Sequence, residues 1–314
     1  MDCVKRERVG GKGCKFESSG KCQEPSQPYY YCIEYMKHKP WMLSFSSLKI
    51  WEQCPRKYYY TDILGIKRKE IYSSLPLRLG SYFHGLHSQS QIPVYFAEDE
   101  IRGKFNIDIL YKVMLELELY PPSIFHEMEV ENRDIGFKGI VDLYSMDYFG
   151  ELKLSAKPEN YLNNWLAYDQ LAYYFLLRRS VSYAYMLPVR TPALKEGKDE
   201  DNEMYKNRLY KDILSRPKFY FPEYGVNRSQ CKWGRKYYAH EFDMELLKRK
   251  IAWHRDEIRY ALNHGYFVQK FGNCTMYGNL CDYSPICESG EINEEVFEHK
   301  QSVNSTINKE GDIL

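Results

Sequence analysis

The spacing of hydrophobic positions divides the chain into helical segments followed by strands. Helical spacing starts near residue 44, where Ser46 or Ser47 is expected to cap a helix that ends close to Gly65. The side chains that this helix turns inward are Leu48, Trp51 and Tyr58. A second helix is predicted after Pro76 and a third over residues 105–119.

Beyond residue 123 the hydrophobic positions alternate with polar ones, as they do in strands. Three short strands joined by tight turns are predicted at residues 124–131, 135–144 and 148–154. The later segments are expected to be a helix at 161–178, a strand at 181–189, a loop at 191–202, a strand at 219–224 and an amphipathic helix at 244–263. This order predicts an α/β or α+β core with mainly helical wrapping.

The composition excludes a disordered chain and leaves room for one large domain or two small ones. Of 314 residues, 44% are hydrophobic and 16% are aromatic, which is enough to form a core. Residues 1–41 carry little hydrophobic periodicity and are expected to form an irregular extension. From residue 288 onward there are seven acids and two lysines, so residues 289–314 are predicted to be an acidic flexible tail.

The chain shows no segment that would take it to or through a membrane. No window is long and apolar enough for a transmembrane helix, and residues 1–11 are charged, unlike a secretory signal. A cytoplasmic location is therefore expected. In that compartment the nine cysteines are not expected to form structural disulfides, and their clustering points towards metal binding.

Positive charge is concentrated in one stretch, although the formal net charge is only +1. Residues 204–240 hold nine Lys or Arg against two acids, and aromatic side chains lie between them. Such a run predicts a surface that follows single-stranded DNA by phosphate contact and base stacking, with an ordinary solvated surface as the equal alternative. The candidate DNA-binding residues are Arg216, Lys218, Arg228, Lys232, Arg235 and Lys236.

Two predicted strands carry carboxylates that would meet in the sheet. On the strand at 148–154, Glu151 and Lys153 share one face and two leucines occupy the other. Antiparallel pairing with the preceding strand would bring Asp142 close to Glu151, and two neighbouring carboxylates repel each other unless a cation lies between them. Hard oxygen ligands suit Mg²⁺ or Mn²⁺, with Lys153 placed to hold an attacking water or to offset charge on a phosphate. For Glu151 and Lys153 alone, a surface ion pair is the simpler interpretation.

Two predicted helices add further candidates. His84 would supply a third metal ligand, with His87 as a lower-ranked substitute, although a lone helical histidine is more often structural. Gln170 and Tyr174 lie four residues apart on one helix face, where they could donate to phosphate or brace Lys153.

The order of these motifs resembles a known family. The chain carries, in sequence, Gly80-x-x-x-His84, Gly139-x-x-Asp142, Glu151-x-Lys153 and Gln170-x-x-x-Tyr174. This series is similar to the RecB-type branch of the PD-(D/E)XK nuclease superfamily over roughly residues 43–287, although Val141 replaces the usual proline. The resemblance implies a small mixed sheet flanked by helices and a divalent-metal phosphodiesterase acting on DNA. It also implies metal ligands at His84, Asp142 and Glu151, a catalytic Lys153, and a supporting pair at Gln170 and Tyr174.

Eight of the nine cysteines form two groups, and Cys231 stands apart. Cys54, Cys274, Cys281 and Cys287 could hold either Zn²⁺ or an iron–sulfur cluster, and the residues alone do not choose between them. The resemblance to iron–sulfur exonucleases of the AddB and CRISPR-associated types implies a [4Fe–4S] cluster that ties the chain ends together, with a longer gap between Cys274 and Cys281 than in that family. The second group is Cys3, Cys14, Cys22 and Cys32, for which a zinc knuckle and a disordered arm are equal alternatives.

The sequence therefore predicts a metal-dependent DNA nuclease with its domain at 42–288, most simply an exonuclease on single-stranded or free ends. Recombination, repair, and CRISPR or phage DNA processing would suit it, alone or with a helicase or recombination partner. A catalytically inactive DNA-binding subunit and a zinc-binding interaction protein are the alternatives.

Overall fold

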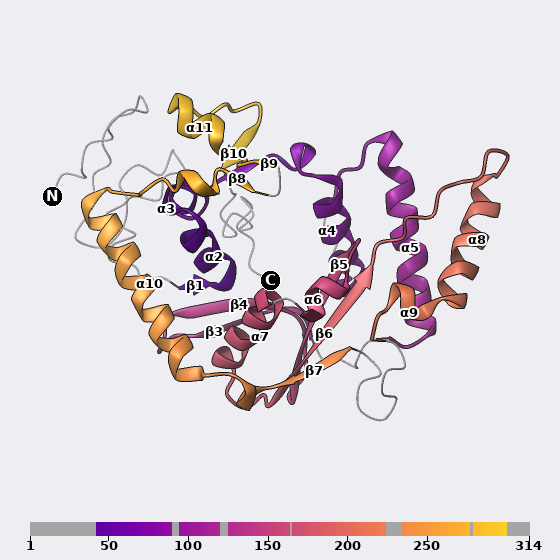
Figure 1. Ribbon diagram of the computed structural model, residues 1–314, viewed down its shortest axis with the longest axis horizontal. Coiled ribbons are helices and arrows are strands. Elements are labelled where there is room, and N and C mark those ends of the chain that lie inside the picture. The colour runs from indigo at the N-terminus through magenta and orange to yellow at the C-terminus, as the bar shows by residue number, and fades with distance from the viewer. Residues whose placement is uncertain are drawn as a thin grey trace, which may run out of the picture. The chain divides into compact units, whose positions relative to one another are not determined.

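The computed structural model describes residues 42–89, 94–119, 125–163, 165–223, 234–276 and 279–299. The chain divides into two compact units, drawn in Figure 1. Unit 1 contains the described residues up to Lys69 and from Ile251 onward, and unit 2 runs from Glu70 to Lys250. The interval 42–288, predicted as a single domain, thus spans both units. The N-terminal cysteines Cys3, Cys14, Cys22 and Cys32 lie outside the described residues.

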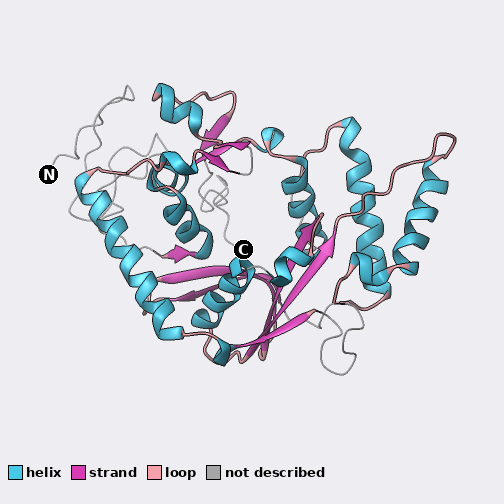
Figure 2. Cartoon of the chain, viewed as in Figure 1, coloured by secondary structure: helices cyan, strands magenta, loops and turns pink. Residues whose placement is uncertain are grey.

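Unit 2 is built on a mixed sheet, seen as magenta arrows in Figure 2. Its strands, in spatial order, are β3 (Phe125–Asn132), β4 (Phe137–Tyr144), β5 (Tyr148–Ser155), β6 (Tyr183–Arg190) and β7 (Arg235–Tyr238). β5 and β6 are parallel, and the other neighbouring pairs are antiparallel. The α/β fold with a mixed sheet flanked by helices is therefore confirmed, and it is consistent with the PD-(D/E)XK nuclease fold.

Helices cover both faces of this sheet. α4 (Leu75–Ser88), α5 (Ile101–Glu116) and α8 (Asn202–Ser215) share a buried core with Leu152 of β5. α7 (Trp165–Leu177) packs on the other face, where Tyr174 and Phe175 contact Phe149. The shorter segments are η2 (Glu70–Tyr72), η3 (Glu98–Glu100), α6 (Glu159–Asn163), α9 (Pro217–Tyr220) and η4 (Ala239–Glu241). Alternation along β5 therefore buries the leucines among α4, α5 and α8 and turns Glu151 the other way.

Some predicted elements of unit 2 differ from the structure. The strand expected at 219–224 is wrong, because α9 ends there, at Tyr220. Pro217 occupies the start of α9, where a missing backbone N–H costs nothing, and this position favours a helix. Helix α8 was not predicted at all, although Asp201 caps it by accepting a hydrogen bond from the Met204 backbone N–H at 2.8 Å.

The first segment of unit 1 confirms the predicted helix but divides it. α2 (Phe45–Gln53), α3 (Pro55–Tyr58) and the π-helical η1 (Tyr59–Ile63) follow the short β1 (Leu43–Ser44). The division falls at Pro55, whose ring removes a hydrogen-bond donor. The cap is Ser44, not Ser46 or Ser47, since the Ser44 hydroxyl accepts from the Ser47 N–H at 3.1 Å.

The second segment of unit 1 contains most of the remaining elements. These are the end of α10 (Met244–His264), η5 (Phe271–Asn273), β8 (Thr275–Met276), β9 (Asn279–Leu280), α11 (Ser284–Ser289) and β10 (Phe297–His299). β10 pairs with β2 (Ile66–Arg68), and Phe297 is buried there. The prediction of a flexible tail from residue 289 is therefore wrong for the residues up to His299. There the buried ring of Phe297 and the pairing of β10 with β2 fix the chain.

A histidine joins two helices of unit 1. His254 on α10 lies 2.9 Å through Nδ1 from Glu257 Oε2 and 3.2 Å through Nε2 from Glu52 Oε1 on α2. Trp51 donates from Nε1 to the same Glu257 oxygen at 3.0 Å. The hydrogen bond and charge of Glu52, followed by those of Glu257, raise the pKa of His254 against the opposing effect of burial.

Stability of unit 1 should fall with rising pH through this group. A histidine whose pKa is raised by folding contributes stability below its unfolded pKa of about 6.5, and that stability is lost as pH passes the folded value. As the pH rises from the unfolded to the folded pKa of His254, we expect the thermal midpoint of the wild type to drop by a few degrees. The thermal midpoint of His254→Gln should change less over the same pH range. His264→Gln, at an exposed histidine of the same helix, is the control. Equal pH slopes for wild type and His254→Gln would contradict this assignment.

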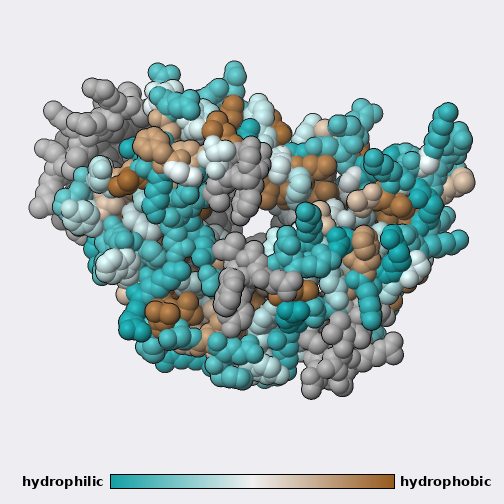
Figure 3. Space-filling view, in the orientation of Figure 1, coloured by the Kyte–Doolittle hydropathy of each residue, from teal (hydrophilic) through white to brown (hydrophobic). Residues whose placement is uncertain are grey.

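No helix in the described part of the chain is long and apolar enough to cross a membrane. Hydrophobic residues appear only as scattered patches on the face drawn in Figure 3.

Candidate active site and cysteine centre

The point at which β4 and β5 separate fixes Asp142. The two strands pair at Leu143–Gly150 and Tyr144–Phe149, and the described pairing ends there. Gly150 permits this close approach, because a Cβ at that position would lie 3.0 Å from Leu143. Beyond the last pair, Asp142 Oδ2 accepts a hydrogen bond from the Leu152 N–H at 2.7 Å. The carboxylate thus replaces a ladder partner, which holds it rigidly beside Glu151.

Glu151 is deeply buried beside this carboxylate. Its side chain is 1% exposed, and Oε1 forms an ion pair with Lys153 Nζ. Oε2 has no hydrogen-bond partner among the described residues. Burial and the charge of Asp142 raise the pKa of Glu151 to about 7, despite the opposing charge of Lys153. An exposed surface ion pair, the simpler interpretation of these two residues, is therefore excluded.

Lys153 keeps its proton in this setting. Burial disfavours the ammonium, but the charges of Glu151 and Asp142 outweigh that effect and raise the pKa of Lys153. A protonated amine beside two carboxylates can donate to an anionic oxygen.

His84 on α4 faces the same carboxylates. Its Nδ1 lies 3.4 Å from Asp142 Oδ1 and 3.3 Å from Glu127 Oε1 on β3. Burial opposes the charged imidazole, but Asp142 and Glu127 prevail and raise the pKa of His84 to about 10. The substitute histidine, His87, is instead packed against the rings of Phe83 and Tyr111. Burial lowers the pKa of His87 to about 3.

Glu127 is a site residue that the sequence interpretation missed. One ligand atom each from His84, Glu127 and Asp142 lies within 4.8 Å of the others, a spacing that could hold a metal ion. Glu127 has a φ of 49°, which is unusual for a side-chain-bearing residue inside a strand. The sequence signal for Glu127 was a carboxylate on the strand predicted before that of Asp142. Its left-handed backbone conformation could not be predicted, because a single such residue leaves no hydrophobic periodicity. Strained residues of this kind are frequent at functional sites.

The supporting pair braces β4. Gln170 Nε2 donates to the Tyr174 hydroxyl at 2.7 Å, and that hydroxyl donates to the Ile140 carbonyl at 2.7 Å. A Cβ on Gly139 would lie 3.1 Å from the Tyr174 ring, so glycine makes room for the contact. The pair was expected to donate to phosphate or to brace Lys153, whereas these contacts brace β4, the strand that carries Asp142.

These donors fit a divalent cation. Two carboxylates and an imidazole converge, a third carboxylate is buried beside them, and one of its oxygens has no partner among the described residues. Burial, and after it the charge of Asp142, raise the pKa of Glu151, so the two neighbouring carboxylates disfavour each other's charged form. A bound cation would relieve that repulsion.

Residues 42–105 match the family model of the PD-(D/E)XK nuclease superfamily. The match contains His84 and Cys54 but ends before Asp142, Glu151 and Lys153. No curated protein matches the sequence. One solved chain, from Eubacterium rectale and provisionally named an exonuclease, aligns at 15% identity over 60% of this chain and 84% of that chain, with a TM-score of 0.37.

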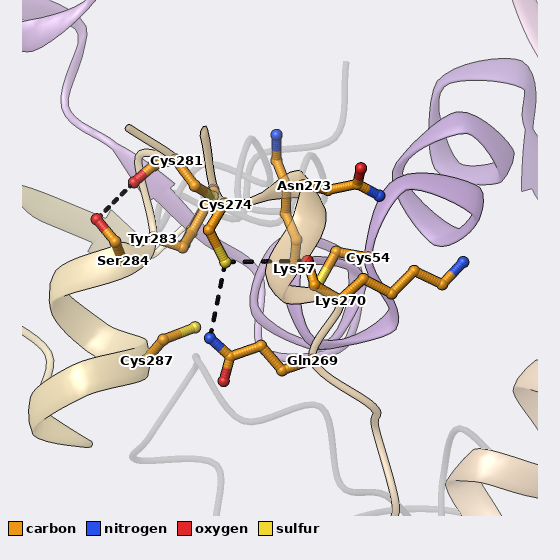
Figure 4. A pocket seen from close by; sticks show the side chains of 10 residues that line it. All are labelled: Cys54, Lys57, Gln269, Lys270, Asn273, Cys274, Cys281, Tyr283, Ser284 and Cys287. Carbon is orange, nitrogen blue, oxygen red and sulfur yellow. Dashed lines mark hydrogen bonds between the residues drawn. The ribbon is translucent and has the colours of Figure 1, made fainter. Parts of the chain in front are cut away.

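Unit 1 gathers four cysteines around one pocket. Cys54, Cys274, Cys281 and Cys287 all line it, and Figure 4 shows the Sγ atoms of Cys54, Cys274 and Cys287 pointing towards its middle. None of the four takes part in a disulfide among the described residues. Burial raises the pKa of the Cys287 thiol, and the neighbouring Cys281 and Cys54 raise it further. Four soft donors that repel one another as thiolates fit a metal centre.

The structure explains the long gap between Cys274 and Cys281. Between the two cysteines, β8 and β9 pair antiparallel, with Thr275 opposite Leu280 and Met276 opposite Asn279. The Cys281 N–H donates to the Cys274 carbonyl at 2.7 Å. The two cysteines are therefore close in space despite the six residues between them, as they would be with a shorter gap in the sequence.

The basic run is only partly described, since Arg228 and Lys232 lie outside the described residues. Arg216 pairs with Asp212, and Arg235 donates to the Leu162 carbonyl at 2.8 Å. Lys236 lies 3.7 Å from the centre of the Tyr183 ring. Lys218 is on α9. These contacts hold three of the cations against the protein itself.

Proposed function

We propose that the chain is a divalent-metal-dependent DNA nuclease of the PD-(D/E)XK superfamily. The observation that carries this proposal is the buried pair of Asp142 and Glu151, with the partly exposed Lys153 beside them and His84 facing them from α4. Placing like charges in a buried site costs stability, and catalysis is the usual reason to retain them.

The proposed ligands are His84, Asp142, Glu151 and the additional Glu127. Asp142 orients the group, because its second oxygen is fixed on the β5 backbone. Bound Mg²⁺ or Mn²⁺ would act as a Lewis acid that stabilises charge on the phosphate. The Lys153 ammonium would donate a hydrogen bond to the oxygen on which the same charge develops, and Gln170 with Tyr174 hold β4 in place.

Cleavage assays with the full chain test this proposal. End-labelled single- and double-stranded DNA should be cut with Mn²⁺ and left intact with a chelator. Lys153→Ala should reduce the rate about a hundredfold, because it removes one charge that stabilises the transition state. Lys138→Ala, at an exposed lysine on β4 that pairs with Glu129, should change the rate little. Absence of both cleavage and Mn²⁺ binding would favour the inactive DNA-binding subunit.

The substrate is proposed to be DNA with single-stranded or free ends, met through the basic run at 204–240. Arg216, Lys218, Arg228, Lys232, Arg235 and Lys236 are the proposed contacts. Arg216, Arg235 and Lys236 already interact with other residues of the protein. DNA phosphates would have to displace those interactions or bind beside them. Recombination, repair, and CRISPR or phage processing, with a helicase or recombination partner, are the proposed settings.

The four-cysteine pocket is proposed to hold a [4Fe–4S] cluster with a structural role. The support is the convergence of Cys54 with Cys274, Cys281 and Cys287 on one pocket, together with the family resemblance. Metal analysis of anaerobically purified protein distinguishes iron with sulfide from zinc. Zinc at this pocket would support the zinc-binding alternative for unit 1.

A further inference from the structure

Glycine is costly at position 80, and neither its backbone conformation nor its contacts with the described residues account for it. Gly80 lies inside α4, where glycine is among the least favourable helical residues. It has no positive φ, unlike Gly65, Gly136 and Gly290. A Cβ there would meet no heavy atom of the described residues within 4 Å, whereas at Gly139 it would meet Tyr174 at 3.1 Å. Neither backbone conformation nor packing therefore requires the glycine.

Position 80 lies on the helix face that carries the candidate metal ligand. Gly80 and His84 are one turn apart on α4. Side chains on a helix lean towards its N-terminus, so a side chain at position 84 is directed towards the turn that contains Gly80. A Cβ at position 80 would still lie more than 4 Å from the His84 side chain, so the space between them is open.

The candidate site opens to solvent around the same imidazole. The side chains of His84 and Glu127 are 24% and 33% exposed, and that of Lys153 is 23% exposed. Those of Asp142 and Glu151 are 10% and 1% exposed. A large anionic substrate must therefore approach past the exposed group, and the surface of α4 at Gly80 adjoins it.

We propose that Gly80 is a clearance position, whose missing side chain leaves room for the sugar–phosphate backbone of the DNA strand that enters the site. This inference rests on the proposed nuclease function. Gly80 contacts no ligand-forming side chain itself, so it acts by leaving space and not by chemistry. It determines access for a polymer and leaves metal binding unaffected.

A graded series of side chains tests the proposal. Gly80→Ala and Gly80→Leu should lower kcat/KM for a labelled single-stranded oligonucleotide in order of size, with at least a tenfold loss for leucine carried mainly by KM. Mn²⁺ affinity, measured by calorimetry, should match the wild type for both. The thermal midpoint of Gly80→Ala should be equal or higher, since alanine favours the helix. Ser81→Leu, at the next, exposed residue of α4, is the matched control and should keep near wild-type kinetics.

The outcomes are separable. Wild-type kcat/KM for Gly80→Leu would overturn the clearance role while leaving the nuclease proposal intact. A parallel loss of Mn²⁺ affinity would also overturn it, because the substitution would then act on the ligands. Failure of the wild type to cleave any DNA would instead refute the proposed function on which this inference depends.

Discussion

Asp142→Asn is expected to reduce DNA cleavage by at least about a thousandfold and to abolish measurable Mn²⁺ binding. The substitution removes a negative charge from the proposed ligand group but keeps the size of the side chain. The amide oxygen can still accept the hydrogen bond that Asp142 Oδ2 receives from the Leu152 N–H. The fold should therefore survive, and DNA binding should be retained. Calorimetry with Mn²⁺ and cleavage of end-labelled DNA measure the two effects.

Asp147→Asn is the matched control for this experiment. Asp147 is exposed and lies in the turn between β4 and β5. Its substitution by asparagine therefore removes the same charge from the same part of the sheet without touching the site. Its variant should bind Mn²⁺ and cut DNA as the wild type does. If Asp142→Asn behaved in the same way, Asp142 would be neither a ligand nor a catalytic residue, and the active-site assignment would be lost.

Cys281→Ser is expected to release the proposed cluster and to unfold unit 1 at temperatures at which unit 2 stays folded. The binding energy of a structural metal centre contributes directly to folding, and serine is a poor ligand for iron or zinc. Among the described residues, the core cluster that packs against Cys281 and Cys287 has five buried members, Tyr60, Ile66, Tyr283, Ile286 and Phe297. So small a core gains much of its stability from such a centre.

Visible absorbance and thermal unfolding measure this effect. The wild type should show the charge-transfer absorbance of an iron–sulfur cluster, and Cys281→Ser should lose it together with a separate unfolding transition. Cys231→Ser, at the one cysteine of the sequence that belongs to neither group, should keep both. A Cys281→Ser protein with unchanged absorbance and unfolding would show that Cys281 holds no metal.

The sequence predicted the parts of the site that depend on alternation and chain order. Glu151 and Lys153 were placed on one face because strand side chains alternate, and Asp142 was placed nearby because a short turn joins its strand to theirs. His84 could be placed only as a residue of a helix, since which strand it faces depends on packing. The structure turns it towards Asp142 and Glu127.

What the sequence did not predict depends on single residues or on distant contacts. Glu127 reaches the site through one left-handed backbone conformation, which hydrophobic periodicity does not encode. Pro217 turned an apparent strand into a short helix, although aromatic residues favour strands. Phe297 is ordered by pairing with β2, more than two hundred residues earlier, so local acidity wrongly suggested a flexible tail.

The chain order of unit 1 has a consequence for synthesis. Cys54 is translated early, but its three partners follow only after all of unit 2 has been made. Residues from His84 to Tyr174 can gather into the proposed active site while the ribosome is still working, because domains generally fold as units from the N-terminal side. Insertion of the proposed cluster would then be the final maturation step. Before that step, the chain would carry a completed candidate active site and an open, oxidation-sensitive set of thiols.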